Sequence, residues 1–409
     1  MVNKKQKSHI LVVSQYFHPE PFRINDICVE WVNRGYKVTV VTGIPNYPEG
    51  KFYKEYGYFK RRTERWEGIN IIRIPVIPRG KTVMGMIANY LSFIVSAFFW
   101  VKFSKINADY VFTSEVSPMT QALLGVWYSQ KHKVPHYLYV QDLWPENVEI
   151  VAGIHSPLLL KPIEEMVDYI YKNCTEIFAT SQSFVTEICK RGVNKKKVHY
   201  WPQYAEDYYR PVEKEIAHQL VPEIPNDGVF KVIFTGNIGH AQGLEVLPHI
   251  AKRLKKSGEK IRFILVGDGR GKENLKRIIQ QENVEDMFLL IGRQPGKRIP
   301  AMLACCDAAY LSFMRNALFA KTIPAKLQSY LACGMPIIGM VSGESKRVID
   351  DASCGLCGSI EDVDKAVENI KDLLGLDDHQ LKTMKDNALK YSSNNFNKKR
   401  LMDFMDEFL

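Results

Sequence analysis

Short apolar runs alternate with segments of helical spacing along the first half of the chain. The runs cover residues 10–14, 38–42, 71–75, 110–113 and 136–141. Runs that are apolar at nearly every position are typical of strands covered on both faces, as in parallel sheets. The segment 24–34, which ends at Gly35, has the apolar spacing of a helix between two of these strands. The first half therefore predicts an α/β domain.

The same alternation restarts in the second half. Strands are predicted at 231–235, 261–266, 287–291, 308–312 and 336–340, with helices at 243–257, 271–281, 298–304 and 324–332. Because 409 residues are too many for one ordinary core, we expect two doubly wound domains in tandem. The Pro- and charge-rich stretch 202–227 should contain their boundary. The domains are then 1–205 and 206–385, and a helix at 386–409 is expected to pack back toward the first domain.

Residues 83–103 do not follow the soluble pattern. The segment has no charged residue before Lys102 and is long enough to span a bilayer. Asn89, Ser92 and Ser96 fall on one helical face and leave the opposite face apolar. Basic residues precede the segment at Lys60, Arg61, Arg62, Arg65, Arg73, Arg79 and Lys81. Basic residues beside an apolar helix favour docking of 60–103 at a membrane interface. Burial against the first sheet and a full membrane span stay open.

Composition and charge narrow the class of protein. Apolar residues make up 46% of the chain and charged residues 24%, which indicates a globular protein. The net charge is +10, and residues 1–205 carry most of it, with 26 Lys or Arg against 17 Asp or Glu. A basic half attracts phosphate in nucleic acid, anionic lipid or a diphosphate substrate. No aromatic-basic RNA-binding module is visible, so nucleic acid is not an expected partner.

The cysteines and the N-terminal pattern indicate the compartment. Cys354 and Cys357 have C-x-x-C spacing, but no second pair or His cluster accompanies them, so a zinc site is not expected. The apolar run at 10–14 is too short for a signal peptide. We expect a cytoplasmic protein with reduced thiols.

Glycine-rich turns follow three predicted strands of the second half. They contain Gly236, Gly239 and Gly243 after the first strand, Gly267, Asp268 and Gly269 after the second, and Gly292 and Arg293 after the third. A further helix begins at Pro324 and carries Lys326 in its first turn. Glycine turns and helix N-termini at the carboxyl ends of parallel strands bind phosphate. The sequence therefore predicts a nucleotide diphosphate site at this edge.

Motifs in both halves resemble a known family of enzymes. GNIGHAQGLE (236–245), LVGDG (265–269), IGR (291–293) and IPAKLQSYLACGMPIIG (323–339) resemble the donor-binding domain of glycosyltransferase family 4, retaining enzymes of the GT-B fold. SQYFHPEPFRINDI (14–27), TGIPNYPEGK (42–51) and YVQDLWPENVE (139–149) are similar to bacterial O-antigen N-acetylfucosaminyltransferases and colanic-acid transferases. The resemblance implies two Rossmann-like domains, with doubly wound parallel sheets, that face a central cleft.

The resemblance further implies that the second domain binds a UDP-sugar donor. The implied donor-binding residues are Gly236, Asn237, Gly239, Gln242, Gly267, Asp268, Gly269, Arg293, Lys326 and Ser329. The chain departs from the family pattern at Lys321 and Ser329, which stand where the two glutamates of a Glu-x7-Glu motif usually stand. The Arg and Lys that usually follow the first glycine turn are also missing. We expect Lys326, with Arg293, to supply the positive charge for the diphosphate.

The first domain is expected to bind the acceptor through the turns that follow its strands. The candidate acceptor-binding residues are Glu20, Arg23, Asn25, Asn46, Trp144 and Glu146. The catalytic candidates are Asp142, His18 and Lys321. Asp142 stands beside Gln141, which replaces a His common at this turn in the family. Structural roles stay open, because Asn25 could cap the first helix and Trp144 could pack the domain.

We therefore expect a retaining glycosyltransferase that moves an N-acetylated deoxyhexose or hexosamine from a UDP-sugar. The expected acceptor is a polyprenyl-diphosphate-linked or growing glycan of bacterial O-antigen or capsule synthesis, at the anionic inner leaflet of the plasma membrane. Such a transfer needs no protein nucleophile, since positioning and charge stabilisation dominate. No cofactor or metal is expected, because no Asp-x-Asp motif follows an early strand. The alternatives are a GT-B nucleotide-sugar epimerase and a non-catalytic nucleotide- or glycan-binding relative.

Overall fold

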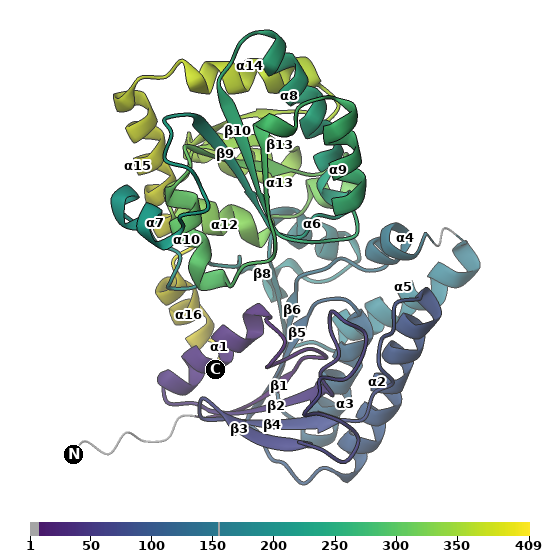
Figure 1. Cartoon of the computed structure of the whole chain (residues 1–409). Coiled ribbons are helices and arrows are strands. Elements are labelled where there is room, and N and C mark those ends of the chain that lie inside the picture. The colour runs from purple at the N-terminus through teal and green to yellow at the C-terminus, as the bar shows by residue number, and fades with distance from the viewer. Residues whose placement is uncertain (1–7, 154–155) are drawn as a thin grey trace, which may run out of the picture. The chain divides into compact units, whose positions relative to one another are not determined.

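The chain folds into two compact units (Figure 1). The computed structural model describes residues 8–153 and 156–409. The first unit comprises Met1–Trp201 together with Met402–Leu409, and the second comprises Pro202–Leu401. The chain therefore leaves the first unit at residue 201, slightly before the expected boundary. Of the expected helix 386–409, only the last turns belong to the first unit.

An eight-stranded sheet forms the centre of the first unit. In spatial order its strands are β3 (Thr63–Trp66), β4 (Ile69–Ile74), β2 (Lys37–Gly43), β1 (His9–Val13), β5 (Tyr110–Glu115), β6 (His136–Val140), β7 (Glu176–Ala179) and β8 (Val198–Tyr200). Its helices are α1 (Arg23–Asn33), α2 (Val83–Phe103), α3 (Ala122–His132), α4 (Glu146–Ala152), α5 (Pro157–Lys172) and α6 (Gln182–Lys190). β3 pairs antiparallel with β4, and the other neighbours are parallel. β1, β2, β5 and β6 are buried at nearly every position, as strands covered on both faces must be.

The second unit contains a six-stranded sheet in which all neighbours are parallel. In spatial order its strands are β11 (Phe288–Ile291), β10 (Ile261–Val266), β9 (Phe230–Thr235), β12 (Ala308–Ser312), β13 (Ile337–Met340) and β14 (Gly355–Gly358). Its helices are α7 (Lys214–Leu220), α8 (Leu247–Lys256), α9 (Lys272–Gln281), α10 (Ile299–Ala304), α11 (Ala317–Ala320), α12 (Ala325–Ala332), α13 (Gly343–Ala352), α14 (Val363–Leu374) and α15 (Asp378–Asn395). α16 (Lys398–Asp406) then carries the chain back to the first unit. The strand order reverses between β9 and β12, where doubly wound sheets bind their ligands.

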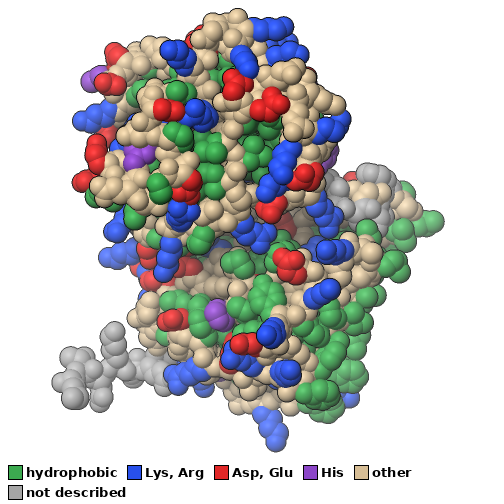
Figure 2. Space-filling view, viewed as in Figure 1, with side chains coloured by type: hydrophobic (Ala, Val, Ile, Leu, Met, Phe, Trp, Pro, Cys, Tyr) green, Lys and Arg blue, Asp and Glu red, His purple; other side chains and the backbone are tan. Residues whose placement is uncertain are grey.

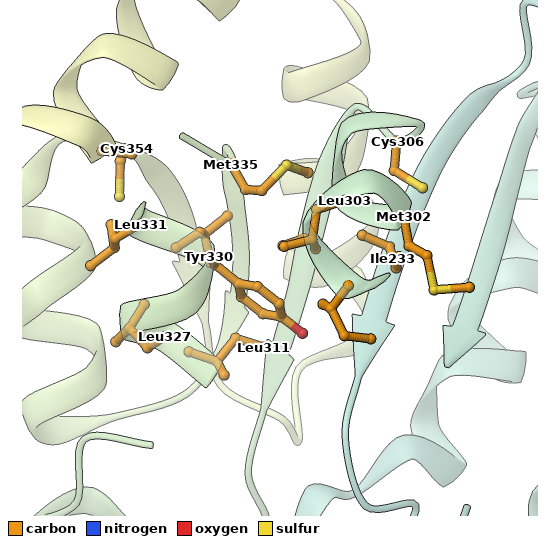
Figure 3. Close-up of a cluster of buried hydrophobic side chains, with 14 of the residues drawn as sticks. Ile233, Met302, Leu303, Cys306, Leu311, Leu327, Tyr330, Leu331, Met335 and Cys354 are labelled. Atoms are coloured by element: carbon orange, nitrogen blue, oxygen red, sulfur yellow. The ribbon is translucent and has the colours of Figure 1, made fainter. Parts of the chain in front are cut away.

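Alternate residues of β9 fill two different cores, one on each face of this sheet. Ile233 belongs to the core that contains Leu327 and Tyr330 of α12 (Figure 3). Its neighbours Val232 and Phe234 belong to the core on the other face. This alternation follows from the two-residue period of a strand. α12 is thereby packed firmly against the strands whose ends form the candidate donor site.

The prediction misses the strands β3, β7, β8 and β14. Each has only three or four residues, too few for a clear periodic pattern. β3 is also polar, because its sequence TERW leaves every position exposed or half-buried at the edge of the sheet. Sequence periodicity therefore identifies the central strands and loses the short outer ones.

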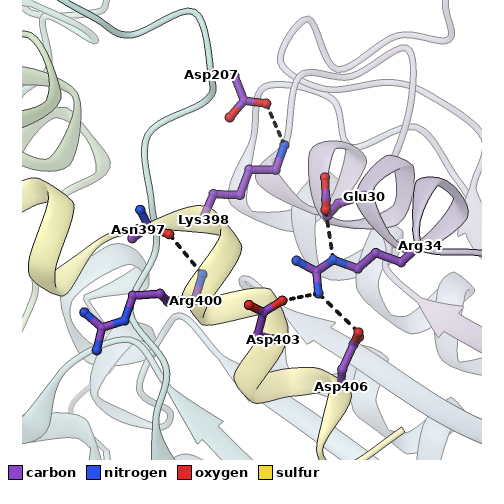
Figure 4. A network of polar contacts seen from close by, with 8 residues as sticks. All are labelled: Glu30, Arg34, Asp207, Asn397, Lys398, Arg400, Asp403 and Asp406. Carbon is purple, nitrogen blue, oxygen red and sulfur yellow. Dashed lines mark hydrogen bonds and ion pairs between the residues drawn. The ribbon is translucent and has the colours of Figure 1, made fainter.

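The C-terminal residues are bound to α1 through Arg34 (Figure 4). The Arg34 guanidinium donates to Asp403 at 2.7 Å and Asp406 at 3.1 Å, and its Nε donates to Glu30 at 2.9 Å. Tyr137 Oη also donates to the Phe408 carbonyl at 2.6 Å. The end of the chain is therefore an integral part of the first unit.

α2 presents its polar residues to the protein and its apolar residues outward. Ser96 Oγ donates to the Pro75 carbonyl and Asn89 Nδ2 to the Ile77 carbonyl, both at 2.6 Å. These bonds orient the polar face predicted from the sequence toward the connection between β4 and α2. The helix is long and apolar enough to cross a membrane, and only 17% of its most apolar window is buried. It is therefore not enclosed within its own unit.

The outward side of α2 forms an exposed apolar face, which Figure 2 shows as hydrophobic side chains gathered along this helix. The face is made of Val83, Met84, Ile87, Leu91, Val95, Phe98, Phe99 and Phe103. Phe59 and, at the start of α5, Leu158 and Leu159 are further exposed apolar residues of the same unit. The sequence places Arg73 in the basic cluster that precedes this helix. In the structure Arg73 is fully buried and paired with Glu64, so it adds no charge to the surface.

Candidate functional site

In the second unit, the backbone hydrogen bonds between β9, β10 and β11 continue into the turns that follow these strands. Gly236 N donates to the Val266 carbonyl and Gly267 N to the Ile291 carbonyl, each at 2.9 Å. Ile238 N donates to the Asp268 carbonyl at 2.9 Å. Three adjacent turns are thus joined through their backbones at one edge of the sheet.

Glycine is required where these turns touch. A Cβ on Gly267 would lie 1.8 Å from the Gly236 carbonyl oxygen, and one on Gly269 would lie 2.3 Å from the Ile238 carbonyl oxygen. Both distances are far inside van der Waals contact, and Gly267 has a φ of +147° that side chains rarely allow. The predicted residues Gly236, Gly267 and Gly269 therefore meet in a backbone layer that no larger residue could form.

Lys326 lies beside this layer, in the first turn of α12. Its Nζ is 2.5 Å from Gln242 Oε1 and 4.0 Å from the centroid of the Phe234 ring of β9. A Cβ on Gly236 would be 3.3 Å from Nζ. Burial lowers the pKa of Lys326 to about 7. The structure thus brings the predicted residues Gly236, Gln242 and Lys326 together where the strand order reverses.

Asp268 and Arg293 belong to the exposed rim of the same edge. Asp268 accepts from Gly269 N at 2.9 Å, and Lys272 Nζ lies 3.6 Å from its carboxylate. The pKa of Asp268 is lowered, first by the Gly269 amide, then by Lys272 and, more weakly, by Arg293. Asn237 faces both Gly239 and Gly269, since its amide lies within 3 Å of the Cβ position of each.

Ser329 and Lys321 lie on the segment that follows β12. Ser329 is buried, and its hydroxyl donates to the Ala325 carbonyl of its own helix at 3.2 Å. Lys321 caps the C-terminus of α11. Sequence reasoning missed Phe234, whose ring lies under the Lys326 ammonium. An aromatic residue one position before the end of a strand is the only signal that could have indicated it.

In the first unit, Glu20 and Asn46 connect the loops that follow β1 and β2. The buried Glu20 carboxylate accepts from the backbone N of Asn46 at 2.8 Å, Tyr47 at 2.7 Å and Phe17 at 3.3 Å. Burial raises the pKa of Glu20 to about 7, against the opposing effect of these three amides. Asn46 is also buried, and its Oδ1 accepts from Arg79 N at 2.9 Å. These contacts shape the loops themselves.

His18 and Asn25 are also held by the loop after β1. The His18 ring stacks on Trp66 at 4.1 Å, and burial lowers its pKa. Asn25 Oδ1 accepts from His18 N at 3.2 Å, and Asn25 Nδ2 donates to the Glu20 carbonyl at 2.8 Å. The interpretation of Asn25 as a helix cap is wrong, because α1 begins at Arg23 with Phe22 as its cap.

Asp142 and Trp144 follow β6 and contact the loop after β5. Asp142 Oδ2 accepts from Ser117 N at 2.7 Å, and burial raises the pKa of Asp142. Trp144 is buried, and its Nε1 donates to Ser117 Oγ at 3.1 Å. Glu146 begins α4, two residues further on. Ser117 and the fully buried Glu115 of β5 were not predicted, since neither belongs to a recognisable motif.

Arg23 opens α1 close enough to Tyr139 of β6 for its charge to lower the pKa of that phenol, although burial raises this pKa overall. The carboxyl ends of β1, β5 and β6 thus bring Arg23, Asp142 and Trp144 to one edge of the first sheet. Among the described residues, no three His, Cys, Asp or Glu side chains gather as a metal-binding group. The absence of a metal requirement stays a prediction.

Comparisons with known proteins agree with this arrangement of two units. Residues 22–203 match the "Glycosyl transferase 4-like domain" model and residues 219–391 match "Glycosyl transferases group 1". The colanic acid biosynthesis glycosyl transferase WcaI of Escherichia coli K12 is 25% identical over 325 residues, which cover 75% of this chain and 76% of that protein.

Solved structures show the same fold at low sequence identity. Sucrose-phosphate synthase of Thermosynechococcus elongatus has a TM-score of 0.77 at 15% identity, with 98% of both chains covered. HepE of Anabaena, in complex with UDP and glucose, has a TM-score of 0.71 at 15% identity and covers 98% of this chain and 99% of its own. WaaG, a glycosyltransferase of lipopolysaccharide biosynthesis, has a TM-score of 0.67 at 14% identity, with 96% and 98% covered.

Two parallel-sheet α/β units with these neighbours define the GT-B class of fold. Within this fold class, the matches to both domain models also define the family of the chain. It belongs to the glycosyltransferases that combine a family-4-like domain with a group 1 domain.

Proposed function

We propose that this protein is a retaining glycosyltransferase of bacterial surface polysaccharide synthesis that takes its sugar from a UDP-sugar. The names of WcaI and WaaG, and the UDP and glucose bound by HepE, support this assignment. The observation that carries it is the position of Lys326 beside the joined glycine turns, where the second sheet reverses its strand order.

In the proposed donor site, Lys326 takes the place of the charged residues that the family pattern has and this chain lacks. Lys326 supplies positive charge for the diphosphate, and Gln242 and Phe234 hold its ammonium in place. An anion close to a buried ammonium raises its pKa, so binding of a diphosphate favours the charged form of Lys326. Arg293 adds charge at the rim. With the leaving group stabilised in this way, transfer with retention needs no protein nucleophile.

The proposed sugar is an N-acetylated deoxyhexose or hexosamine, and the proposed acceptor is a polyprenyl-diphosphate-linked or growing glycan. Support for a lipid-linked acceptor comes from α2 of the first unit. The polar side chains of this helix contact the protein, and its apolar face is exposed. Lys81 and Arg79 precede this helix and Lys102 and Lys105 lie at its end. An apolar helix face flanked by cations suits peripheral binding to an anionic bilayer from the cytoplasmic side.

The donor assignment is tested by calorimetry with UDP. Lys326→Ala should weaken UDP binding about tenfold or more, because it removes a charge-assisted contact to the diphosphate. Lys276→Ala is the matched control, since Lys276 is an exposed lysine of α9 paired only with Glu273 among the described residues. It should bind UDP as the wild type does. Equal affinities for both variants would remove Lys326 from the site.

The reaction is tested separately with a panel of UDP-sugars and a polyprenyl-diphosphate-linked sugar in vesicles, followed by mass spectrometry. A product longer by one sugar, with the anomeric configuration of the donor, supports retaining transfer. Conversion of the donor to its epimer without an acceptor would identify an epimerase instead. UDP binding without any turnover would identify a non-catalytic relative.

A further inference from the structure

Ser117 lies in the loop after β5 and contacts the loop after β6. Its backbone N donates to Asp142 Oδ2 at 2.7 Å. Its Oγ accepts from Trp144 Nε1 at 3.1 Å and from Asn147 Nδ2 at 2.7 Å. One serine therefore contacts three residues of the segment 142–147, and two of these, Asp142 and Trp144, are candidate site residues.

The hydrogen-bond capacity of a hydroxyl decides where the Ser117 proton goes. A serine hydroxyl has two acceptor lone pairs and one proton to donate. Trp144 and Asn147 both donate to this oxygen, so its proton is available to an acceptor other than these two side chains. The Asp142 carboxylate accepts the Ser117 amide, and the Ser117 hydroxyl is near enough to lower the pKa of Asp142 as well. The amide and the hydroxyl of Ser117 thus both act on this carboxylate.

We propose that Ser117 is the positioning residue for Asp142, and that it fixes the orientation of this carboxylate. The proposal rests on the proposed function and on the expectation from the sequence that Asp142 is a catalytic residue of this transfer. Ser117 acts through Asp142 and does not itself touch a substrate. By accepting from Trp144 and Asn147, it also ties the Asp142 backbone turn to the start of α4.

The surroundings explain why Asp142 requires two donors. The fully buried Glu115 of β5 accepts from Asp142 N at 3.4 Å, and its own pKa is raised by burial and then by the Asp142 charge. Burial and, more weakly, the Asp142 charge raise the pKa of Tyr90 of α2. Burial likewise raises the pKa of Asp142 itself. The two Ser117 donors oppose that tendency.

Removal of the hydroxyl gives a distinct signature. In Ser117→Ala, Asp142 loses one donor, so its pKa should rise by about one pH unit. The acidic limb of the kcat–pH profile should move upward by the same amount, and kcat should fall about tenfold or more while KM for the donor stays unchanged. Ser117→Thr keeps the hydroxyl and should restore both values.

Ser129→Ala is the matched control, since Ser129 is also half-buried in the first unit and its hydroxyl donates to the Val134 carbonyl at 2.6 Å. It loses a comparable bond away from Asp142 and should leave the pH profile unchanged. If Ser117→Ala does not fold, Ser117→Cys, which keeps a weaker donor, should show a smaller shift in the same direction.

The carboxyl titration of Asp142, followed by carbon NMR in the free protein, provides a readout that does not depend on activity. A higher pKa in Ser117→Ala than in the wild type and in Ser129→Ala supports the proposal. Equal titrations in folded variants would overturn it. If the wild type transfers no sugar, the proposed function fails, and the NMR titration still decides whether Ser117 controls Asp142.

Discussion

The ammonium of Lys326 lies 4.0 Å from the centre of the Phe234 ring, so that a residue of α12 covers the face of a residue of β9. The ring has two opposing effects. Its π-face attracts the positive charge, while its bulk keeps water away and contributes to the burial that lowers the pKa of Lys326 to about 7. The charge on Lys326 is therefore sensitive to pH near neutrality and to any anion placed beside it.

UDP affinity should accordingly decrease as pH rises from 7 to 9. The free protein loses the Lys326 proton over this range, and binding of the diphosphate must recover it. Calorimetry in buffers of different ionisation enthalpy should detect proton uptake on binding. Lys326→Arg, which stays charged, should bind UDP with little pH dependence above pH 7. A wild-type affinity that is flat across this range would contradict the prediction.

Substitution of Gly267 by Ala should disrupt the joined turns. The new Cβ would meet the Gly236 carbonyl oxygen at 1.8 Å, so the backbone of one turn must move. We expect a loss of about 2 kcal/mol or more in the free energy of unfolding, with weaker UDP binding. Gly292→Ala is the control, because nothing lies within 4 Å of its Cβ position. Urea unfolding should separate the two variants, and equal stabilities would show that the turn yields without cost.

The apolar face of α2 should bind the protein to vesicles. Replacement of Leu91, Val95 and Phe98 by Ser removes apolar side chains that are each more than half exposed, so folding should persist. Vesicles that contain anionic lipid should float with the wild type and not with this variant, and high salt should weaken the wild-type interaction. Replacement of the exposed Ile216 and Leu220 of α7 is the matched control. Unchanged flotation of the α2 variant would show that this helix is not the anchor.

Stability should decrease below pH 6.5 because of His136. Its ring is buried against Thr113 Oγ1 at 2.9 Å, and burial lowers its pKa to about 3. Between pH 6.5 and 3 the unfolded chain binds a proton that the folded protein does not, so stability rises with pH in this window. The contribution lost from pH 6.5 to 5 is about 2 kcal/mol.

Urea unfolding at pH 5 and pH 7 tests the His136 prediction. His136→Gln should reduce the difference between the two pH values by about that amount. His379→Gln, at an exposed position of α15, should leave it unchanged. An unaltered difference in His136→Gln would assign the pH dependence to other groups.

The sequence predicts the central part of the fold because the central strands are buried on both faces and therefore apolar throughout. The glycine turns are also predictable from the sequence, because Gly267 and Gly269 lie where any larger residue would clash with the backbone. Lys326 is predictable from its place in the first turn of a helix that begins after a proline. These features depend on local sequence.

The remaining site residues depend on contacts between distant loops. The polar side chains of Glu20 and Asn46 indicate a binding site in the sequence. In the structure they accept hydrogen bonds from the backbones of the loops instead. Ser117 has no motif, and its importance appears only when the loops after β5 and β6 meet. The orientation of α2 could not be inferred either, because helical spacing separates its two faces without indicating which one meets the protein.

The return of Met402–Leu409 to the first unit has a consequence for biosynthesis. These residues are synthesised after the whole second unit, so the unit that is begun first is completed only after the other one. Until then the Tyr137 hydroxyl lacks the Phe408 carbonyl and the Phe178 ring lacks its edge contact with the Phe408 ring. A chain terminated before Met402 would thus be defective in its first unit, although the missing residues follow the whole second unit.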